Sequence, residues 1–411
     1  MEDFRPTEIA EQYGTPTYVM NLDIVRDNFK GLEKSITKAA RESKLFYAVK
    51  ANPLLSILTA IRNMGGGAEV VSRGEIEAAV RAGFRGDDMI FNGPGKTRGE
   101  IERALGLGVY SINVESLEEL VETEKIAKAL STRCRVGFRI NPGLLVRTHK
   151  YLAVASRGSK FGLDPRNYVR ALEAASRSDY LRPVGIHMHI GSQISLISEF
   201  KRAFGIAMHF VRVFEDMIGE APDFIDLGGG IALNYKTGRP SIAWDRISSE
   251  AISELTESHA WPRGAKLLME PGRAIVGNAG ILLTRVLYVK ESTRTNWAIT
   301  DAGMNCLMRT ALYGTKHRIA SLAGKRGKRT AYMIGGPICE SGDTFGRYFL
   351  PALARGDLLA ILDAGAYGSS MSSNYNGQPR PATVVVDSGS FRMAERREDL
   401  EDLFIRQIGP Q

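Results

Sequence analysis

Short apolar runs alternate with amphipathic stretches from Leu45 to Arg273. The segments between the runs repeat apolar residues at helical spacing, as in Gly74–Arg81 and Ser116–Val121. Strands that alternate with helices form a parallel sheet. Eight such units over about 230 residues predict a (β/α)8 barrel, with a doubly wound open sheet as the alternative. The eight predicted strands are Leu45–Val49, Glu69–Ser72, Met89–Asn92, Tyr110–Val114, Arg135–Ile140, Val184–Ile190, Phe224–Leu227 and Leu267–Glu270.

The pattern changes after Gly277. Here β-rich runs follow one another with few long helical patterns between them, and Gly and Pro punctuate them. This predicts a second, all-β domain, a Greek-key-like sandwich or barrel, to which Thr17–Met20 adds a strand. We expect an α/β chain with the barrel at residues 22–277 and the β domain at residues 1–21 plus 278–411. The runs are Ile281–Val289, Trp297–Thr300, Arg329–Ile334, Leu358–Leu362 and Ala382–Val386.

Polar residues and glycines gather where the predicted barrel strands end. In a barrel of this kind the carboxyl ends of all strands share one face, and active sites are built there. We therefore expect side chains from distant parts of the chain to meet at one mouth. They are Lys50, Ser72, Asn92, Arg139, Asn141, His187, His189, Gly228–Gly230, Glu270 and Arg273.

Composition and charge argue against several classes of protein. The 411 residues are 44% hydrophobic and 24% charged, and no apolar run approaches the roughly 20 residues of a membrane span. Met1–Pro6 lacks the apolar core of a secretory signal, and three cysteines are too few for a disulfide framework, so we expect a cytoplasmic protein. The net charge is +8, and the basic run Lys325–Arg329 contains no aromatic residues, which argues against nucleic-acid binding. A basic surface favours an anionic cofactor or substrate.

Lys50 follows the apolar run Leu45–Val49, and Ala51-Asn52-Pro53 then ends the strand. A lysine at the end of a buried strand needs a partner or a reaction, and such lysines form Schiff bases with carbonyl cofactors. The alternative is an amine that simply extends to water. The lysine alone does not decide between them.

Two segments offer groups for an anionic, aromatic cofactor. The three glycines Gly228, Gly229 and Gly230 let backbone N–H groups approach a phosphate, to which Ser192 can add a hydroxyl, although glycine-rich turns are also common as plain loops. Glu270 can keep a heteroaromatic nitrogen protonated. Arg273 can bind a carboxylate or a phosphate, but the two residues can also form an ordinary ion pair.

Histidine and cysteine suggest further chemistry. His187 and His189 alternate along a predicted strand, so we expect them to point the same way. No set of acidic or cysteine ligands at metal spacing accompanies them, so we predict no metal and favour an imidazole stacked on a flat ring. Cys339 beside Glu340 can act as a proton donor or as a nucleophile, but no hydrolase triad is recognisable around it.

Together these segments resemble the fold-type III pyridoxal-phosphate decarboxylases, and most closely the diaminopimelate decarboxylase branch. The resemblance covers about Thr15 to Leu403. It rests on the motifs Phe46–Asn52, His187–Gln193, Asp226–Gly230, Glu270–Arg273, Cys339–Asp343 and Asp363–Gly368.

The resemblance assigns roles to individual residues. Lys50 would hold pyridoxal 5'-phosphate as a Schiff base, His189 would stack on its ring, and Glu270 would pair with the ring nitrogen. Cys339 would reprotonate the substrate carbon, and the segment around it would enter a partner's barrel in a homodimer with shared sites. The phosphate would be held by Gly228, Gly229, Gly230, Ser192, Gly272 and Tyr367, with Arg273 also at the cofactor. Substrate contacts would come from Arg273, Arg309, Tyr313, Glu340 and Tyr367.

The activity that the resemblance implies is decarboxylation of meso-2,6-diaminopimelate to L-lysine. Glu340 suits a distal ammonium group and two arginines suit a distal carboxylate, a combination that a diamino diacid requires. Decarboxylation of another amino acid, such as ornithine, lysine, arginine or a carrier-tethered one, is the alternative. Two further alternatives are a binding or regulatory protein without turnover and a metal-dependent hydrolase. The sequence departs from the family pattern at Glu69, Met188, Cys306 and Thr310.

Overall fold

The chain divides into two units in a computed structural model that describes residues 5–40, 42–144, 158–253, 261–324 and 327–409. One unit, which we call the barrel unit, comprises Arg26–Ala232 and Pro240–Ala274. The other, the sheet unit, comprises Met1–Val25, Leu233–Arg239 and Ile275–Gln411. The basic run Lys325–Arg329 begins with two residues that lie outside the described ranges.

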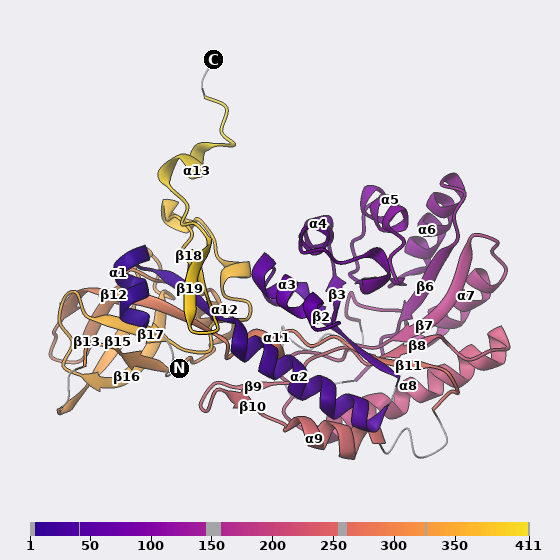
Figure 1. Ribbon diagram of the computed structural model, residues 1–411, viewed down its shortest axis with the longest axis horizontal. Helices are drawn as coiled ribbons and strands as arrows, with labels where there is room; N and C mark the ends of the chain where they lie inside the picture. Colours follow the sequence, from indigo (N-terminus) through magenta and orange to yellow (C-terminus); the bar gives the residue numbers. More distant parts are fainter. Residues whose placement is uncertain (1–4, 41, 145–157, 254–260, 325–326, 410–411) are drawn as a thin grey trace. The chain divides into compact units, whose positions relative to one another are not determined.

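The barrel unit is built on eight parallel strands that close on themselves (Figure 1). The last strand pairs with both the first and the seventh, so the sheet has no free edge and the open-sheet alternative is wrong. Each predicted barrel strand is present. In order round the barrel the strands are β11 (Lys266–Met269), β2 (Ser43–Ala48), β3 (Gly67–Val70), β4 (Met89–Phe91), β5 (Ser111–Val114), β6 (Cys134–Arg139), β7 (Leu181–His187) and β8 (Phe224–Asp226).

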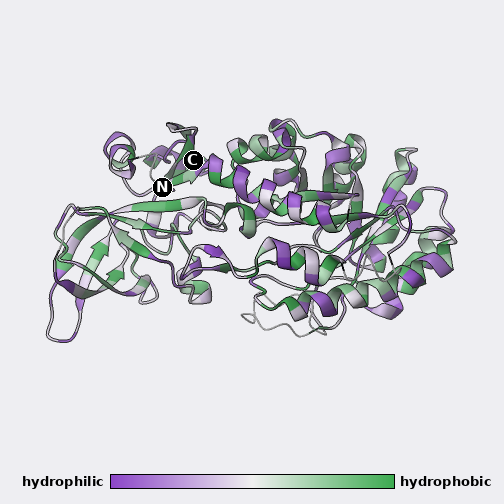
Figure 2. Cartoon of the chain, turned by 60° about the horizontal axis from the view of Figure 1, so that its bottom comes forward, coloured by the Kyte–Doolittle hydropathy of each residue, from purple (hydrophilic) through white to green (hydrophobic). Residues whose placement is uncertain are grey.

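Amphipathic helices follow the strands and cover the outside of the barrel (Figure 1). Their starts are set by local hydrogen bonds: the Ser72 and Ser116 side chains cap two helices, and Thr97 with Glu100 forms a capping box. Figure 2 shows green and purple residues on the same helices, as expected of helices with one buried face. The helices are α2 (Leu22–Ala39), α3 (Leu55–Asn63), α4 (Arg73–Arg81), α5 (Arg98–Leu107), α6 (Leu117–Ala129), α7 (Pro165–Ser176), α8 (Ile197–Ile218) and α9 (Trp244–Arg246).

Several strands end one or more residues before the predicted bounds, and two of these differences concern candidate site residues. β7 ends at His187, so His189 lies in the loop beyond it, and the expectation that both histidines alternate along one strand is wrong. β2 ends at Ala48, and Lys50 lies in a single 3-10 turn, η1 (Val49–Ala51). Both shifts place the polar side chain past the sheet hydrogen bonds, at the mouth of the barrel.

The sheet unit contains a nine-stranded mixed sheet. β1 (Thr17–Asn21) pairs antiparallel with β12 (Gly280–Lys290) and parallel with β18 (Ala382–Asp387), which confirms the predicted N-terminal strand. Tyr18 and Val19 lie in two different apolar clusters, so both faces of this strand are buried. The other strands are β13 (Asn296–Thr300), β14 (Ile319–Ser321), β15 (Arg329–Gly335), β16 (Thr344–Pro351), β17 (Leu358–Ile361) and β19 (Ser390–Glu395).

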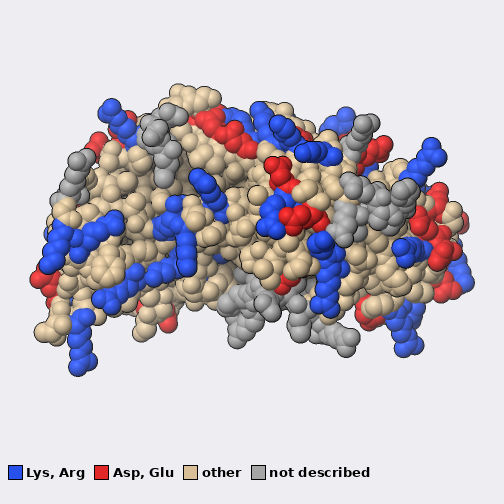
Figure 3. Space-filling view, turned by 90° about the horizontal axis from the view of Figure 1, so that it is seen from below, with Lys and Arg blue, Asp and Glu red and all other residues tan. Residues whose placement is uncertain are grey.

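Short helices complete the sheet unit, and they are α1 (Pro6–Tyr13), α11 (Arg273–Val276, which begins in the barrel unit), α12 (Arg309–Tyr313) and α13 (Leu400–Phe404). Among the described residues no helix combines the length and apolar character needed to cross a membrane. Lysine and arginine side chains are spread over the face in Figure 3, with acidic groups between them.

Candidate active site

The amine of Lys50 lies against a buried carboxylate at the barrel mouth. Lys50 Nζ is 2.5 Å from Oε2 of Glu69, which belongs to β3. The Glu69 side chain is 1% exposed, whereas the Lys50 side chain is 39% exposed and reaches the mouth from the turn after β2. The lysine is therefore anchored by an ion pair and does not simply extend to water.

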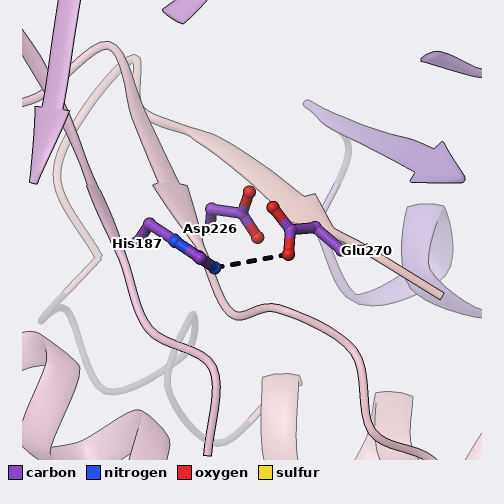
Figure 4. A group of neighbouring side chains, drawn as sticks. All are labelled: His187, Asp226 and Glu270. Atoms are coloured by element: carbon purple, nitrogen blue, oxygen red, sulfur yellow. Dashed lines mark ion pairs between the residues drawn. The ribbon is translucent and has the colours of Figure 1, made fainter. Parts of the chain in front are cut away.

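Three strand ends bring His187, Asp226 and Glu270 together (Figure 4). His187 Nε2 is 3.3 Å from Glu270 Oε2. Burial, the charge of Glu270 and a hydrogen bond to it raise the pKa of Asp226 far above its usual range. Burial alone would raise the pKa of Glu270 as well, but the charge and hydrogen bond of His187 and the charge of Lys50 lower it overall. The raised pKa of Asp226 favours a proton on its carboxyl group, whereas the lowered pKa of Glu270 favours the carboxylate.

The same three residues correct the argument made against a metal. Their ligating atoms lie within 4.8 Å of one another, so two acidic residues do accompany His187. Spacing along the sequence did not reveal this group because its members come from three strand ends. The proton held by Asp226 makes this group a poor cation ligand, because metal binding requires deprotonated ligands. The cluster is better suited to presenting one negative charge, on Glu270.

The glycine loop after β8 leaves its backbone open to close approach. Gly228 and Gly230 have φ of 65° and 102°, which favour glycine. A Cβ at Gly229 would collide with the carbonyl of Glu270, and one at Gly230 would collide with the carbonyl of Gly191. The loop lies where the sequence placed it and has the character of an anion-binding turn.

His189 lies beside this loop as a neutral imidazole. Its Nδ1 accepts the backbone N–H of Gly229 at 3.2 Å. Burial, together with the charges of Arg139 and Lys50, lowers the pKa of His189 to about 3. An uncharged flat ring next to a phosphate-type loop suits stacking on an aromatic cofactor.

Ser192 lies on the loop that follows β7, Gly272 follows β11, and Arg273 is the first residue of α11. Arg273 donates to the hydroxyl of Ser192 at 3.2 Å. A Cβ at Gly272 would lie 2.9 Å from Ala51, in the turn that carries Lys50. The structure thus brings these three predicted residues to the same end of the barrel as Lys50.

Arg309 is enclosed by tyrosines within the sheet unit. Its guanidinium carbon lies 5.6 Å from the ring centre of Tyr235, 5.5 Å from that of Tyr313 and 5.9 Å from that of Tyr367. The side chain is almost fully buried at 1% exposure. Aromatic faces stabilise a cation without neutralising it, so the guanidinium stays able to bind an anion. Sequence reasoning did not include Tyr235.

Cys339 and Glu340 lie on the exposed connection between β15 and β16. The backbone N–H of Cys339 donates to Asn376 Oδ1 at 3.3 Å. Glu340 Oε2 accepts the hydroxyl of Tyr375 at 3.2 Å. Both side chains are presented to the outside of the unit that carries them.

The departures from the family pattern have structural explanations. Cys306 belongs to an apolar cluster of the sheet unit, and burial raises the pKa of its thiol to about 12. Met188 is 2% exposed. The hydroxyl of Thr310 donates to the carbonyl of Leu307. These three residues fill space or cap local structure, whereas Glu69 contacts Lys50 directly.

Comparisons with known proteins agree with this geometry. Residues 24–277 match the family model for the pyridoxal-binding domain of pyridoxal-dependent decarboxylases. The chain is 40% identical to a diaminopimelate decarboxylase of Archaeoglobus fulgidus, over 100% of this chain and 97% of that protein. It is 38% identical to that of Pseudomonas aeruginosa, over 97% and 94%. The diaminopimelate decarboxylase of Helicobacter pylori solved with L-lysine is 34% identical, with a TM-score of 0.90 and 98% of each chain covered.

Proposed function

The chain belongs to the family of pyridoxal-dependent decarboxylases, and on that premise we propose that it converts meso-2,6-diaminopimelate to L-lysine and CO2. The observation that carries the proposal is the match to diaminopimelate decarboxylases over the full chain, which includes the Lys50 turn and the Cys339 connection. A relative of this kind has been solved with L-lysine, the product expected here.

The residues at the barrel mouth fit pyridoxal 5'-phosphate. A glycine loop with positive φ at Gly228 and Gly230 lies at the barrel mouth, and a buried carboxylate and a neutral imidazole lie beside it. The bound cofactor supplies an electron sink for the carbanion left by CO2. The residues that would hold it are Lys50 at its carbonyl carbon, Glu270 at the ring nitrogen, His189 on the ring face, and Gly228–Gly230, Ser192, Gly272, Arg273 and Tyr367 at the phosphate.

The protein's own groups set the charge at the ring. Glu270 is held as a carboxylate by His187 and by the protonated Asp226. A carboxylate in this place keeps a proton on the ring nitrogen, and its own negative charge is stabilised by these two neighbours. His189 is neutral and leaves that charge unopposed.

A proton must reach the substrate carbon after CO2 leaves. We assign this step to the Cys339 thiol, which is exposed at the surface of the sheet unit. Because the thiol faces outward, a second copy of the chain could receive it, and we propose a homodimer with shared sites. Sedimentation of the protein at micromolar concentration tests the dimer, and a monomer at full activity would refute it.

Substrate selection is assigned to two opposite charges. Glu340 would bind the distal ammonium group, and Arg309, held between Tyr313 and Tyr367, would bind the distal carboxylate. Arg273 and Tyr367 would also contact the substrate. A diamino monoacid such as ornithine lacks the distal carboxylate and would therefore lose the contact that we assign to Arg309. We also propose that the protein works in the cytoplasm, where its three free cysteines would stay reduced.

The direct test is release of CO2 and L-lysine from meso-diaminopimelate by the protein loaded with cofactor. Lys50→Ala should abolish both products together with the visible absorbance of the bound cofactor. Lys44→Ala is the matched control, since Lys44 lies on β2, the strand that leads to Lys50, but pairs with Asp88 instead. Turnover retained by Lys50→Ala, or no lysine from the wild-type protein, would overturn the assignment.

A further inference from the structure

One asparagine joins two buried carboxylates at the barrel mouth. Asn92 follows β4 and is 2% exposed. Its Nδ2 donates to Glu69 Oε1 at 3.1 Å and to Glu270 Oε1 at 2.5 Å. Glu69 is the partner of Lys50, and Glu270 is the carboxylate proposed to pair with the cofactor ring. One amide therefore contacts the acids at both ends of the candidate site.

The orientation of this amide follows from its neighbours. Ionised carboxylates only accept hydrogen bonds, so the NH2 group must face Glu69 and Glu270. The remaining oxygen, Oδ1, accepts Nδ2 of Asn113 at 2.8 Å. Asn113 Oδ1 in turn accepts the hydroxyl of Ser111 at 2.9 Å. A flipped amide would set Oδ1 against the two carboxylate oxygens and Nδ2 against the Nδ2 donor of Asn113, so only one orientation satisfies all three contacts.

The next strand of the barrel leaves room for this chain of amides. Gly137 on β6 is buried, and a Cβ there would collide with Oδ1 of Asn113. It would also lie 3.0 Å from the hydroxyl of Ser111. Asn113 and Ser111 are fully buried and Asn92 nearly so, and bulk water therefore cannot replace the hydrogen bonds of the two amides, Asn92 and Asn113. Strands β3, β4, β5, β6 and β11 thus cooperate to fix one side chain.

We propose that Asn92 is a positioning residue for the decarboxylation: its amide holds Glu69 against the Lys50 amine and Glu270 at the cofactor ring, and keeps the two carboxylates in a fixed relation. The inference rests on the proposed function and deepens it. Asn92 touches neither substrate nor cofactor in this assignment and acts through the two acids.

The charges that surround the two acids give the inference its test. Glu270 faces His187, Asp226 and Lys50, and Glu69 faces Lys50, Glu75 and Asp226. An amide between them adds hydrogen bonds but no charge. Aspartate has the same shape as asparagine but no NH2 group. An ionised aspartate at this position adds a third negative charge beside Glu69 and Glu270. A protonated one has a single donor, which can bond only one of the two acids. Asn92→Asp therefore changes the electrostatics at Lys50 with little change in packing.

The experiment is a pH titration of the visible absorbance of the cofactor-loaded protein. Asn92→Asp should move the midpoint upward by about one pH unit or more, because added negative charge favours the protonated nitrogen at Lys50. Its kcat for meso-diaminopimelate should fall about tenfold or more while KM changes by less than about threefold. Asn63→Asp, which adds the same charge at an exposed position of α3, should match the wild-type protein in both.

A second pair of variants guards against a misfolded Asn92→Asp. Asn92→Ala removes both hydrogen bonds, and Asn113→Ala removes only the anchor of the amide; both should lower kcat, Asn113→Ala by less. A wild-type midpoint and wild-type kcat in the folded variants would overturn the proposal, even with a lower melting temperature, because a purely structural amide predicts that result. The titration needs no turnover, so it decides the role of Asn92 even if wild-type protein binds cofactor but releases no CO2.

Discussion

At the scale of single residues, the barrel mouth is defined by protonation states that differ from those of the free side chains. Asp226 keeps a proton because it is buried beside the charge of Glu270. Glu270 loses its proton despite burial, because His187 and Lys50 oppose the desolvation cost. His189 stays neutral. A ring nitrogen placed at Glu270 would therefore meet a single negative charge, which is what an electron sink requires.

Asp226 gives a sharp prediction, because a protonated carboxyl and a primary amide have the same donor and acceptor pattern here. Asp226 Oδ1 accepts the Gly228 N–H at 2.8 Å, and the carboxyl group lies beside that of Glu270. Asp226→Asn should keep activity within about threefold, whereas Asp226→Ala should cost about 2 kcal/mol of unfolding free energy and tenfold or more in kcat. Urea unfolding and steady-state rates measure both. If Asp226→Asn were as damaging as Asp226→Ala, Asp226 would have to act as an anion.

His189 makes the cofactor-free protein sensitive to acid. In the unfolded chain the His189 side chain takes up a proton near pH 6.5, whereas in the folded protein its pKa is about 3. Stability contributed by neutral His189 is therefore complete above pH 6.5 and is lost as the pH falls toward 3. His189→Gln should lose less stability than the wild-type protein between pH 7.5 and pH 5, by on the order of 1 kcal/mol in urea unfolding. His209→Gln, at an exposed position of α8, should show the wild-type loss.

At the scale of helices and strands, the strands with the most buried residues were those that the sequence predicted. All eight barrel strands coincide with short apolar runs because parallel strands are covered on both faces, and each was predicted within a few residues. The missed strands have weaker patterns. β19 is largely exposed along its length, β14 has only three residues, and β16 alternates buried with half-buried or exposed positions and contains Gly346. Their pairing is decided by neighbours far away in the sequence.

The position of the site could also be predicted, but its internal contacts could not. Placing Lys50, His189 and Glu270 at one mouth needed only the rule that strand ends share a face. The contacts of Glu69 with Lys50 and of Asn92 with both acids depend on side-chain directions after strand closure. The clue available beforehand was the departure at Glu69, a buried acid in an apolar strand. Asp226 was visible only as the first residue of the Asp226–Gly230 motif, which assigned it no role.

Gly137 offers a test at the level of a strand. Gly137→Ala should displace the Asn113 amide and so disturb Asn92 from two strands away, lowering kcat about threefold or more and moving the absorbance midpoint. The matched control is Gly205→Ala on α8, where a new Cβ meets nothing within 4 Å and helix propensity should improve stability by about 0.5–1 kcal/mol. Unchanged spectra and rates in Gly137→Ala would show that the amide chain tolerates displacement.

At the scale of the whole molecule, each unit carries part of the proposed chemistry. The barrel unit supplies the lysine, the ring partner and the glycine loop, and the sheet unit supplies the enclosed Arg309 with the exposed Cys339 and Glu340. Solved lysine/ornithine decarboxylases share the fold at 23% identity with a TM-score of 0.80, so the fold alone does not select the substrate. We propose that selection comes from Arg309 and Glu340.

The most direct test of the account is therefore the ratio of kcat/KM for meso-diaminopimelate to that for L-lysine and L-ornithine, measured by CO2 release. We predict a ratio of about 1,000 or more, because the diamino monoacids lack the distal carboxylate that Arg309 is proposed to bind. Comparable values for ornithine or lysine, or a faster rate with either, would contradict the assignment of this chain to diaminopimelate.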